Sequence, residues 1–221
     1  MSKSLLALAQ LQRLLQSING VQAAPVGEFL VDGAARQRLA PHSSPHEALL
    51  VLESGEELHV ALFLDEAVLA QLARGAGEPW SRQRLHGFCA AAEGVSHFLY
   101  LAQRARQGGQ VSQLELEAQA ELDKYLAVLL QLWAVGRRSA SPQLRRKLFD
   151  ESALRPGLAG PERDRYRLAT ALAAACARAL ESRYVVAGRL EALLREARRL
   201  YRLSGGEKFS ALAQGAVAWA A

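Results

Sequence analysis

The fold is decided by residues 81–135, SRQRLHGFCAAAEGVSHFLYLAQRARQGGQVSQLELEAQAELDKYLAVLLQLWAV, in which two helical patterns flank a pair of glycines. In both patterns apolar residues recur every three or four positions, a spacing that is typical of amphipathic helices. Gly108-Gly109 ends the first pattern. Ser112 begins the second, and Glu115 stands at the distance that a capping box requires. Because the link is short, we expect an antiparallel helical hairpin.

A β signal precedes this segment. Two apolar runs, Ala48–Leu52 and Leu58–Leu64, flank the turn sequence Ser54-Gly55-Glu56, and this arrangement predicts a β-hairpin. Asp65 follows as the N-cap of a short helix. Because an isolated two-stranded hairpin is only marginally stable, we expect it to pack on helices or to pair with a short strand at 28–32.

The rest of the chain completes a mostly helical α+β fold, with a small N-terminal β-hairpin or antiparallel sheet packed on a helical bundle. The other expected elements are a helix over 3–18, a loop-like segment over 21–46, a short helix over 143–149, a long helix over 162–202 with Gly188 as a candidate break, and a helix over 207–221. The predicted domains are residues 1–75 and 76–221, with one continuous domain as the alternative.

Composition narrows the protein class. Half of the 221 residues are hydrophobic, which is enough for a sizeable core. No apolar run approaches the ~18 residues of a membrane span, and the run Leu5–Ala9 is too short for a signal peptide. The chain has two cysteines far apart in sequence, Cys89 and Cys176, so we expect a cytoplasmic protein without a disulfide framework.

Charge is distributed unevenly along the chain. Residues 1–135 carry a net charge of −4 and residues 136–221 a net charge of +9, so a homodimer that pairs the two halves is one hypothesis. The basic half is a candidate surface for a protein partner or for nucleic acid. The residues that we single out there are Arg137, Arg138, Arg145, Arg146, Lys147, Arg163 and Arg167. No recognised nucleic-acid motif accompanies them, and acidic residues are interspersed among them.

Four polar residues of the predicted helical hairpin are metal or acid–base candidates. Glu93 and His97 are four positions apart, as are Glu117 and Glu121, so each pair lies on one helix face. Carboxylates and imidazole from facing helices can hold a metal ion, although Glu-x-x-x-His departs from the di-iron pattern Glu-x-x-His. The alternative is a structural network in which His97 lies near Glu121 and Glu93 near Lys124.

The sequence contains no Walker or dinucleotide glycine loop, no GxSxG, no HExxH and no CxxC motif. We therefore assign no catalytic residue and no cofactor.

Three stretches resemble a bacterial protein family to which no activity is attached: Cys89–Tyr100 (CAAAEGVSHFLY), Leu114–Tyr125 (LELEAQAELDKY) and Leu200–Lys208 (LYRLSGGEK). The resemblance covers most of the chain after residue 47. It implies that the helical hairpin and the pairing of His97 with Glu121 belong to the fold, and it implies no catalytic residue.

We expect a non-enzymatic adaptor or assembly protein that acts through protein–protein contacts, with another protein or with itself. Nucleic-acid binding by the basic half is the first alternative. A metal-dependent helical-bundle enzyme that uses Glu93, His97, Glu117 and Glu121 is the second.

Overall fold

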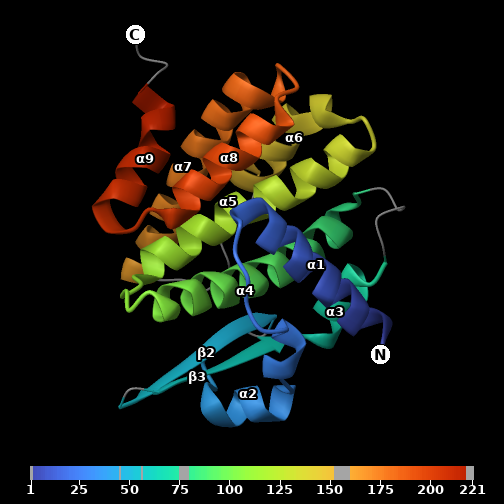
Figure 1. The fold of residues 1–221 in the computed structure, drawn as a ribbon. Coiled ribbons are helices and arrows are strands. Elements are labelled where there is room, and N and C mark those ends of the chain that lie inside the picture. The colour runs from blue at the N-terminus through green and yellow to red at the C-terminus, as the bar shows by residue number, and fades with distance from the viewer. Residues whose placement is uncertain (1, 45, 56, 75–79, 152–159, 218–221) are drawn as a thin grey trace. The chain divides into compact units, whose positions relative to one another are not determined.

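The computed structural model describes residues 2–44, 46–55, 57–74, 80–151 and 160–217 (Figure 1). Its contacts divide the chain into an N-terminal unit, Met1–Ser17 with Val21–Gln110, and a C-terminal unit, Ile18–Gly20 with Val111–Ala221. Together these units form a mostly helical α+β protein with one small mixed sheet in the described residues, which confirms the predicted fold class. The predicted boundary between residues 75 and 76 lies outside the described residues.

The first 110 residues contain the sheet and the helices around it. Their elements are α1 (Lys3–Asn19), a 3-10 turn (Val26–Phe29), β1 (Leu30–Val31), α2 (Gly33–Leu39), β2 (Glu47–Ser54), β3 (Glu57–Leu64), α3 (Glu66–Leu72) and α4 (Arg82–Arg106). The predicted cap at Asp65 is present, and Ser81, where the next helix was expected to begin, is a cap as well, since each side chain accepts a hydrogen bond from a backbone N–H of the helix that follows. Helix α2 was not expected. Asp32 caps it by accepting from the Ala35 amide at 2.7 Å, a local signal inside a segment that otherwise resembles a loop.

The sheet has the strand order β1-β3-β2. Strands β2 and β3 form the predicted antiparallel hairpin, with Glu47 opposite Leu64 and Ser54 opposite Glu57. The short β1 pairs with β3 in parallel, through Leu30 opposite Leu62. Strand β2 is therefore an edge strand along its whole length.

Helices cover both faces of the sheet at its buried end. A Cβ on Gly94 of α4 would lie 2.9 Å from Leu62 and 3.3 Å from Leu64, so the missing side chain lets α4 approach the sheet closely. On the opposite face, the guanidinium of Arg36 from α2 lies 5.2 Å from the ring centre of Phe63. This arrangement follows from the strand alternation, because Leu62 and Leu64 share one face while Phe63 lies on the other.

The C-terminal unit is helical throughout its described residues. Its elements are α5 (Gln113–Ala134), a 3-10 turn (Arg138–Ala140), α6 (Ser141–Arg145), a π-helical turn (Arg146–Asp150), α7 (Gly160–Leu180), a second π-helical turn (Glu181–Val185), α8 (Leu190–Arg202) and α9 (Gly205–Val217). The capping box at Ser112 and Glu115 is present as predicted. The long helix predicted over 162–202 is interrupted, and Gly188 at φ +68° marks the break.

Helices α5 and α7 form the centre of this unit, and α9 packs on α7 (Figure 1). The buried positions of α7 are mostly alanines spaced three or four residues apart, including Ala169, Ala173 and Ala177. Such small side chains let neighbouring helices approach closely, which is the role that the sequence pattern indicates for them. Within the described residues, no helix is both long enough and apolar enough to cross a membrane.

Candidate functional site

The predicted metal candidates are distributed over both units. Glu93 and His97 lie on α4 of the N-terminal unit, and Glu117 and Glu121 lie on α5 of the C-terminal unit. Within the N-terminal unit, His97 Nδ1 lies 3.7 Å from an oxygen of Glu47, a buried residue of β2 that sequence reasoning did not connect with it. In the parts of the chain that the structure describes, no three His, Cys, Asp or Glu side chains are grouped closely enough to hold a metal ion.

Glu121 contacts Lys124 of its own helix, with 2.7 Å between carboxylate oxygen and ammonium nitrogen. The predicted pairings of His97 with Glu121 and of Glu93 with Lys124 join the two units and stay predictions.

The predicted basic residues all lie in the C-terminal unit, and most of them are exposed. Arg145 is the exception, because its side chain is half-buried beside Glu181. Two others contact their own unit: the Arg138 guanidinium lies 5.7 Å from the ring centre of Trp133, and Arg167 lies 4.0 Å from an oxygen of Asp164. The set therefore includes a residue of an internal polar cluster as well as solvated surface charges.

That cluster borders a cavity of about 470 Å³ within the C-terminal unit. The cavity lies between the turn that follows α5, the start of α6 and the π-helical turn after α7. Its lining residues are Gly136, Arg138, Ser139, Ser141, Pro142, Glu181, Val185 and Val186. The sequence did not indicate this site, because Ser141 and Glu181 are forty positions apart and belong to no motif.

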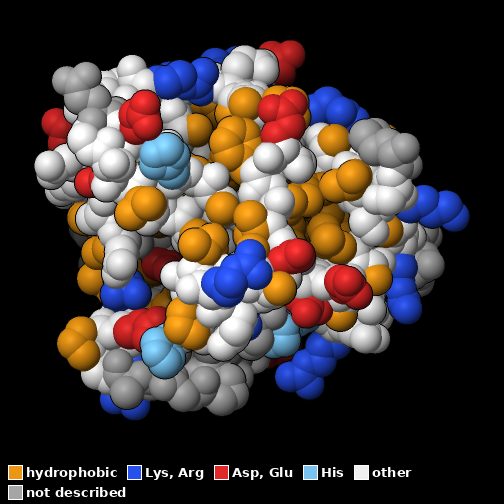
Figure 2. All heavy atoms as spheres, turned by 90° about the horizontal axis from the view of Figure 1, so that it is seen from below, with side chains coloured by type: hydrophobic (Ala, Val, Ile, Leu, Met, Phe, Trp, Pro, Cys, Tyr) orange, Lys and Arg blue, Asp and Glu red, His pale blue; other side chains and the backbone are white. Residues whose placement is uncertain are grey.

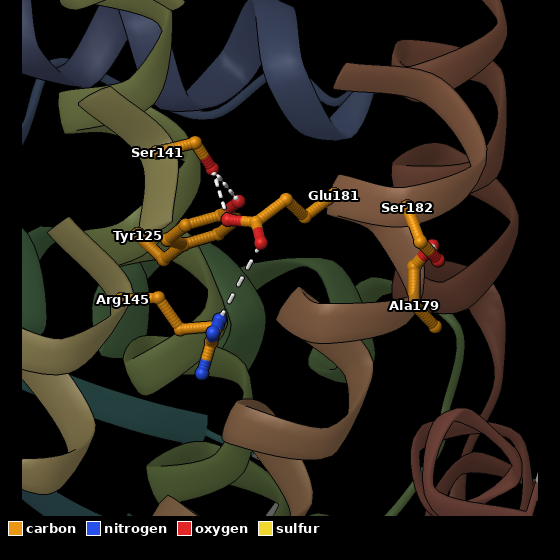
Figure 3. Close-up of polar contacts among 6 residues, drawn as sticks. All are labelled: Tyr125, Ser141, Arg145, Ala179, Glu181 and Ser182. Atoms are coloured by element: carbon orange, nitrogen blue, oxygen red, sulfur yellow. Dashed lines mark hydrogen bonds and ion pairs between the residues drawn. The ribbon is translucent and has the colours of Figure 1, made fainter. Parts of the chain in front are cut away.

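A chain of hydrogen bonds leads from the interior to the cavity (Figure 3). Ser141 Oγ donates to Glu181 Oε2 at 2.6 Å, and the Tyr125 hydroxyl lies 2.8 Å from Ser141 Oγ. Since a serine hydroxyl has one hydrogen, Tyr125 donates to Ser141. The Nε atom of Arg145 lies 3.8 Å from Glu181 Oε1 and completes what we call the open cluster, formed by Tyr125, Ser141, Arg145 and Glu181.

Burial fixes the protonation of the innermost member. Tyr125 is fully buried, and burial raises the pKa of its phenol well above the ordinary value. Tyr125 therefore stays a hydrogen-bond donor at neutral pH. Because Tyr125 donates to Ser141 and Ser141 donates to Glu181, the Glu181 carboxylate is the acceptor at the cavity end of these hydrogen bonds.

The helix is distorted where Glu181 lies. Backbone hydrogen bonds there span five residues instead of four, with Val186 N donating to Glu181 O at 3.1 Å and Arg189 N donating to Tyr184 O at 2.8 Å. The second of these bonds belongs to the helix end at Gly188. A π-helical turn adds a residue to the local repeat and is frequent at functional sites.

The arrangement supports binding better than catalysis. Serine-based acyl transfer uses an imidazole or amine as the base, and the described residues of the lining include no histidine or lysine. Ser141 is 1% exposed and its hydrogen is directed to a carboxylate, so its oxygen is not presented to a substrate. The chemistry that remains is a half-buried carboxylate between apolar walls.

A second buried group of polar residues lies in the same unit. Lys208 Nζ donates to Gln119 Oε1 at 2.7 Å, and Gln119 Nε2 donates to Asp123 Oδ1 at 2.8 Å. Asn19 Nδ2 donates to the same carboxylate at 3.1 Å. We call Asn19, Gln119, Asp123 and Lys208 the closed cluster, because each side chain is at most 1% exposed.

Glu115 connects two helix starts beside the closed cluster. One of its oxygens accepts from the Ser112 amide at 3.0 Å, and the other accepts from the Gly205 amide at 2.8 Å. The Glu115 carboxylate therefore accepts the hydrogen bond of the first amide of α9. An external anion would bind a helix N-terminus at the same place.

No family model matches the chain, and no curated protein or solved structure is similar to it. Function is therefore inferred from geometry and chemistry alone.

Proposed function

We propose that this chain is a non-enzymatic assembly protein that binds an extended segment of another protein along strand β2. The observation that carries the proposal is an open sheet edge formed by an uncharged apolar run, Ala48–Leu52. The two free thiols, Cys89 and Cys176, support a cytoplasmic setting.

The hairpin becomes more exposed toward its turn. Strand β2 is buried at its start, whereas Val51 is 45% and Leu52 is 64% exposed. Val51 is opposite Val60, and Leu52 is opposite His59, so apolar side chains are exposed on both faces toward the turn. In Figure 1 this end of the hairpin points away from α4. Hydrophobic side chains also gather among charged ones on the face shown in Figure 2.

The edge of β2 carries backbone groups that are available for pairing. In an edge strand, alternate N–H and C=O groups point outward and form a template for another strand. Natural edges are usually protected by lysine, proline or a bulge, and Ala48–Leu52 contains none of these. Such an edge fits strand addition, in which backbone hydrogen bonds provide affinity and alternate side chains provide specificity.

Charge favours a different protein as the partner over a second copy. If β2 paired with itself in the antiparallel register that aligns the apolar run, Glu47 would face Glu53 of the second copy, and directly opposite like charges destabilise a sheet. Glu57 adds acidity at the turn end, where its carboxylate lies 3.3 Å from His59. The partner that fits is therefore an extended apolar segment with lysine or arginine at the end that lies beside the exposed Glu53 and Glu57.

A peptide titration tests the proposal. The probe is a fluorescent seven-residue peptide, Lys-Val-Thr-Val-Thr-Val-Lys, and its anisotropy is measured against the full chain. We expect saturable binding, which Val51→Lys weakens by about tenfold because it places a cation on the edge strand opposite a basic peptide. Val135→Lys is the matched control, since Val135 is 64% exposed in the C-terminal unit and receives the same charge.

Backbone pairing is distinguished from general apolar attraction by a second peptide whose alternate amides are N-methylated. Equal binding of both peptides, or equal loss in the two lysine variants, would contradict the proposal. Sedimentation of the peptide-free chain tests whether β2 pairs with a second copy of this chain. A dimer that Val51→Lys disrupts and Val135→Lys leaves intact would show self-association in place of binding to a different protein.

Nucleic-acid binding by the basic residues of the C-terminal unit stays the alternative, because Arg137, Arg138, Arg146 and Lys147 are exposed within a short segment. Filter binding of duplex DNA at increasing salt separates the two functions, since phosphate contacts weaken steeply with salt and strand pairing does not. Elemental analysis of protein purified without chelators tests the metal alternative at Glu93, His97, Glu117 and Glu121.

A further inference from the structure

We propose that the cavity beside Glu181 binds a small molecule that carries a primary ammonium group on a short apolar stem. This site is independent of strand β2 and lies entirely within the C-terminal unit.

The inner wall offers a hydrogen-bond acceptor that the protein leaves partly unused. Glu181 Oε2 accepts from Ser141, whereas Oε1 accepts no hydrogen bond from the described residues. Its nearest cation is Arg145, whose Nε atom is 3.8 Å away, beyond hydrogen-bond distance. That Nε atom is buried and has no hydrogen-bond partner among the described residues either. An ammonium group from a ligand would supply the short, charge-assisted bond that Oε1 lacks.

The open cluster favours a donor rather than an acceptor as its ligand. The Ser141 proton is directed to Glu181, and the Tyr125 proton is directed to Ser141. Neither hydroxyl therefore has a hydrogen to offer a ligand. A neutral alcohol or a carboxylate would meet the Glu181 oxygen without the positive charge that strengthens the contact.

The remaining walls fit an apolar stem. Val185 is buried, while Pro142 is exposed and Val186 is 73% exposed. A volume of about 470 Å³ falls within the range of ordinary small-molecule pockets, which is roughly 300–1,000 Å³. An alkyl chain that covers Val186 and Pro142 would remove their apolar surface from water.

Arg138 is the positive charge in the lining, and it has a place outside the ligand contact. It is exposed, its guanidinium lies over the Trp133 ring, and its Nη2 atom would be 3.5 Å from a Cβ on Gly188. At the inner wall Glu181 lies beside Arg145, and Arg138 adds a positive charge at an exposed residue. A ligand with a carboxylate at the far end of its stem would add a contact to Arg138, so the test includes one.

The experiment is a titration of the full, isotopically labelled chain, followed through its backbone amide signals by NMR. The probes are n-pentylamine, n-pentanol, pentanoate and 5-aminopentanoate, which share one stem and differ in charge. We expect n-pentylamine to saturate and to shift the amides of Ser139, Val185 and Val186, with the alcohol and pentanoate at least about tenfold weaker. If 5-aminopentanoate binds more tightly than n-pentylamine, the ligand class narrows to molecules with both charges.

Glu181→Gln is the decisive variant, because it keeps an acceptor for Ser141 and removes only the charge. We expect it to weaken n-pentylamine binding about tenfold while pentanol binding stays the same. Glu191→Gln is the matched control, since Glu191 is an exposed residue of α8 and the variant has the same net charge. Equal weakening in both variants, equal affinity for n-pentylamine and pentanol, or shifts confined to other residues would overturn the proposal.

Discussion

The two buried polar clusters of the C-terminal unit both start from α5 and differ in what lies beyond them. In the closed cluster, the Gln119 amide lies between Lys208 and Asp123 and hydrogen-bonds both charges, and all three residues are at most 1% exposed. In the open cluster, Tyr125 and Ser141 lead to a carboxylate in the wall of a cavity. The comparison teaches that burial of charge alone does not indicate a site. An acceptor in the wall of a cavity does.

The largest expected effect is on the closed cluster. Lys208→Met removes a fully buried ammonium group and leaves the Asp123 carboxylate charged in the interior. We expect a loss of roughly 3–5 kcal/mol in the free energy of unfolding, measured by urea denaturation, because removing one member of a buried charged network, with its hydrogen bonds to Gln119 and to the Leu200 carbonyl oxygen, is costly. Lys147→Met is the control at an exposed position and should change stability by less than about 0.5 kcal/mol.

The double variant Lys208→Met with Asp123→Asn sharpens this result. Removing the second charge should restore part of the lost stability, because a buried carboxylate is costly once a cation of its network has been removed. A loss below about 1 kcal/mol for Lys208→Met would show that the ammonium is not held in the interior as the structure has it.

Local patterns predicted most of the secondary structure, because each element has its own signal in the sequence. The strand alternation at 58–64, the caps at Asp65 and Ser112 and the break at Gly188 all act within a few residues. Helix α2 was not predicted because it has only seven residues, and two of them, Gly33 and Ala34, add little to an apolar repeat at helical spacing. Only the Asp32 cap distinguished this segment from a loop.

The candidate sites were much harder to predict, because they depend on pairs distant in sequence. Ser141 and Glu181 meet across forty residues, and Gln119 and Lys208 across eighty-nine. Of the residues selected from sequence, Arg145 reaches the open cluster, and His97 reaches Glu47 by a contact that helical spacing alone could not show. Hairpin register was predictable, so the exposed apolar run of β2 is the feature that sequence came closest to identifying.

The second-largest expected effect is a loss of stability at high pH, which reports the burial of the Cys176 thiol. Burial raises the pKa of the Cys176 thiol to about 12, and the Lys208 ammonium partly opposes that rise. The pKa of this thiol is higher in the folded chain than the unfolded value of 9.0. Its contribution to the free energy of unfolding is therefore fully present below pH 9 and is lost as pH rises toward 12. At pH 10.5 we expect Cys176 alone to cost about 2 kcal/mol.

Chemical denaturation at pH 7.5, 9 and 10.5 measures this effect in the unchanged chain and in Cys176→Ala. The variant should lose stability less steeply above pH 9, whereas Cys89→Ala, at a half-exposed position, should follow the unchanged chain. Burial also raises the pKa of Tyr125, so its phenol adds to the loss of stability at high pH in all three proteins. If the free energy of unfolding falls equally steeply with pH in Cys176→Ala and in the unchanged chain, the thiol is accessible to solvent.

The smallest expected effect is on the open cluster. Ser141→Ala removes the hydroxyl between Tyr125 and Glu181 and leaves a buried phenol without an acceptor. We expect a loss of about 1 kcal/mol in urea denaturation, because water in the cavity can solvate the Glu181 oxygen but the phenol is fully buried.

The double variant Ser141→Ala with Tyr125→Phe should lose less stability than the sum of the two single variants, because each single change leaves the other group unsatisfied. The same reasoning applied to Lys208 predicts a far larger loss, since Lys208 and Gln119 are at most 1% exposed. Equal losses for Ser141→Ala and Lys208→Met would remove the distinction between the clusters. Glu181 would then belong to a dry core, and an ammonium ligand could not reach it without unfolding α6.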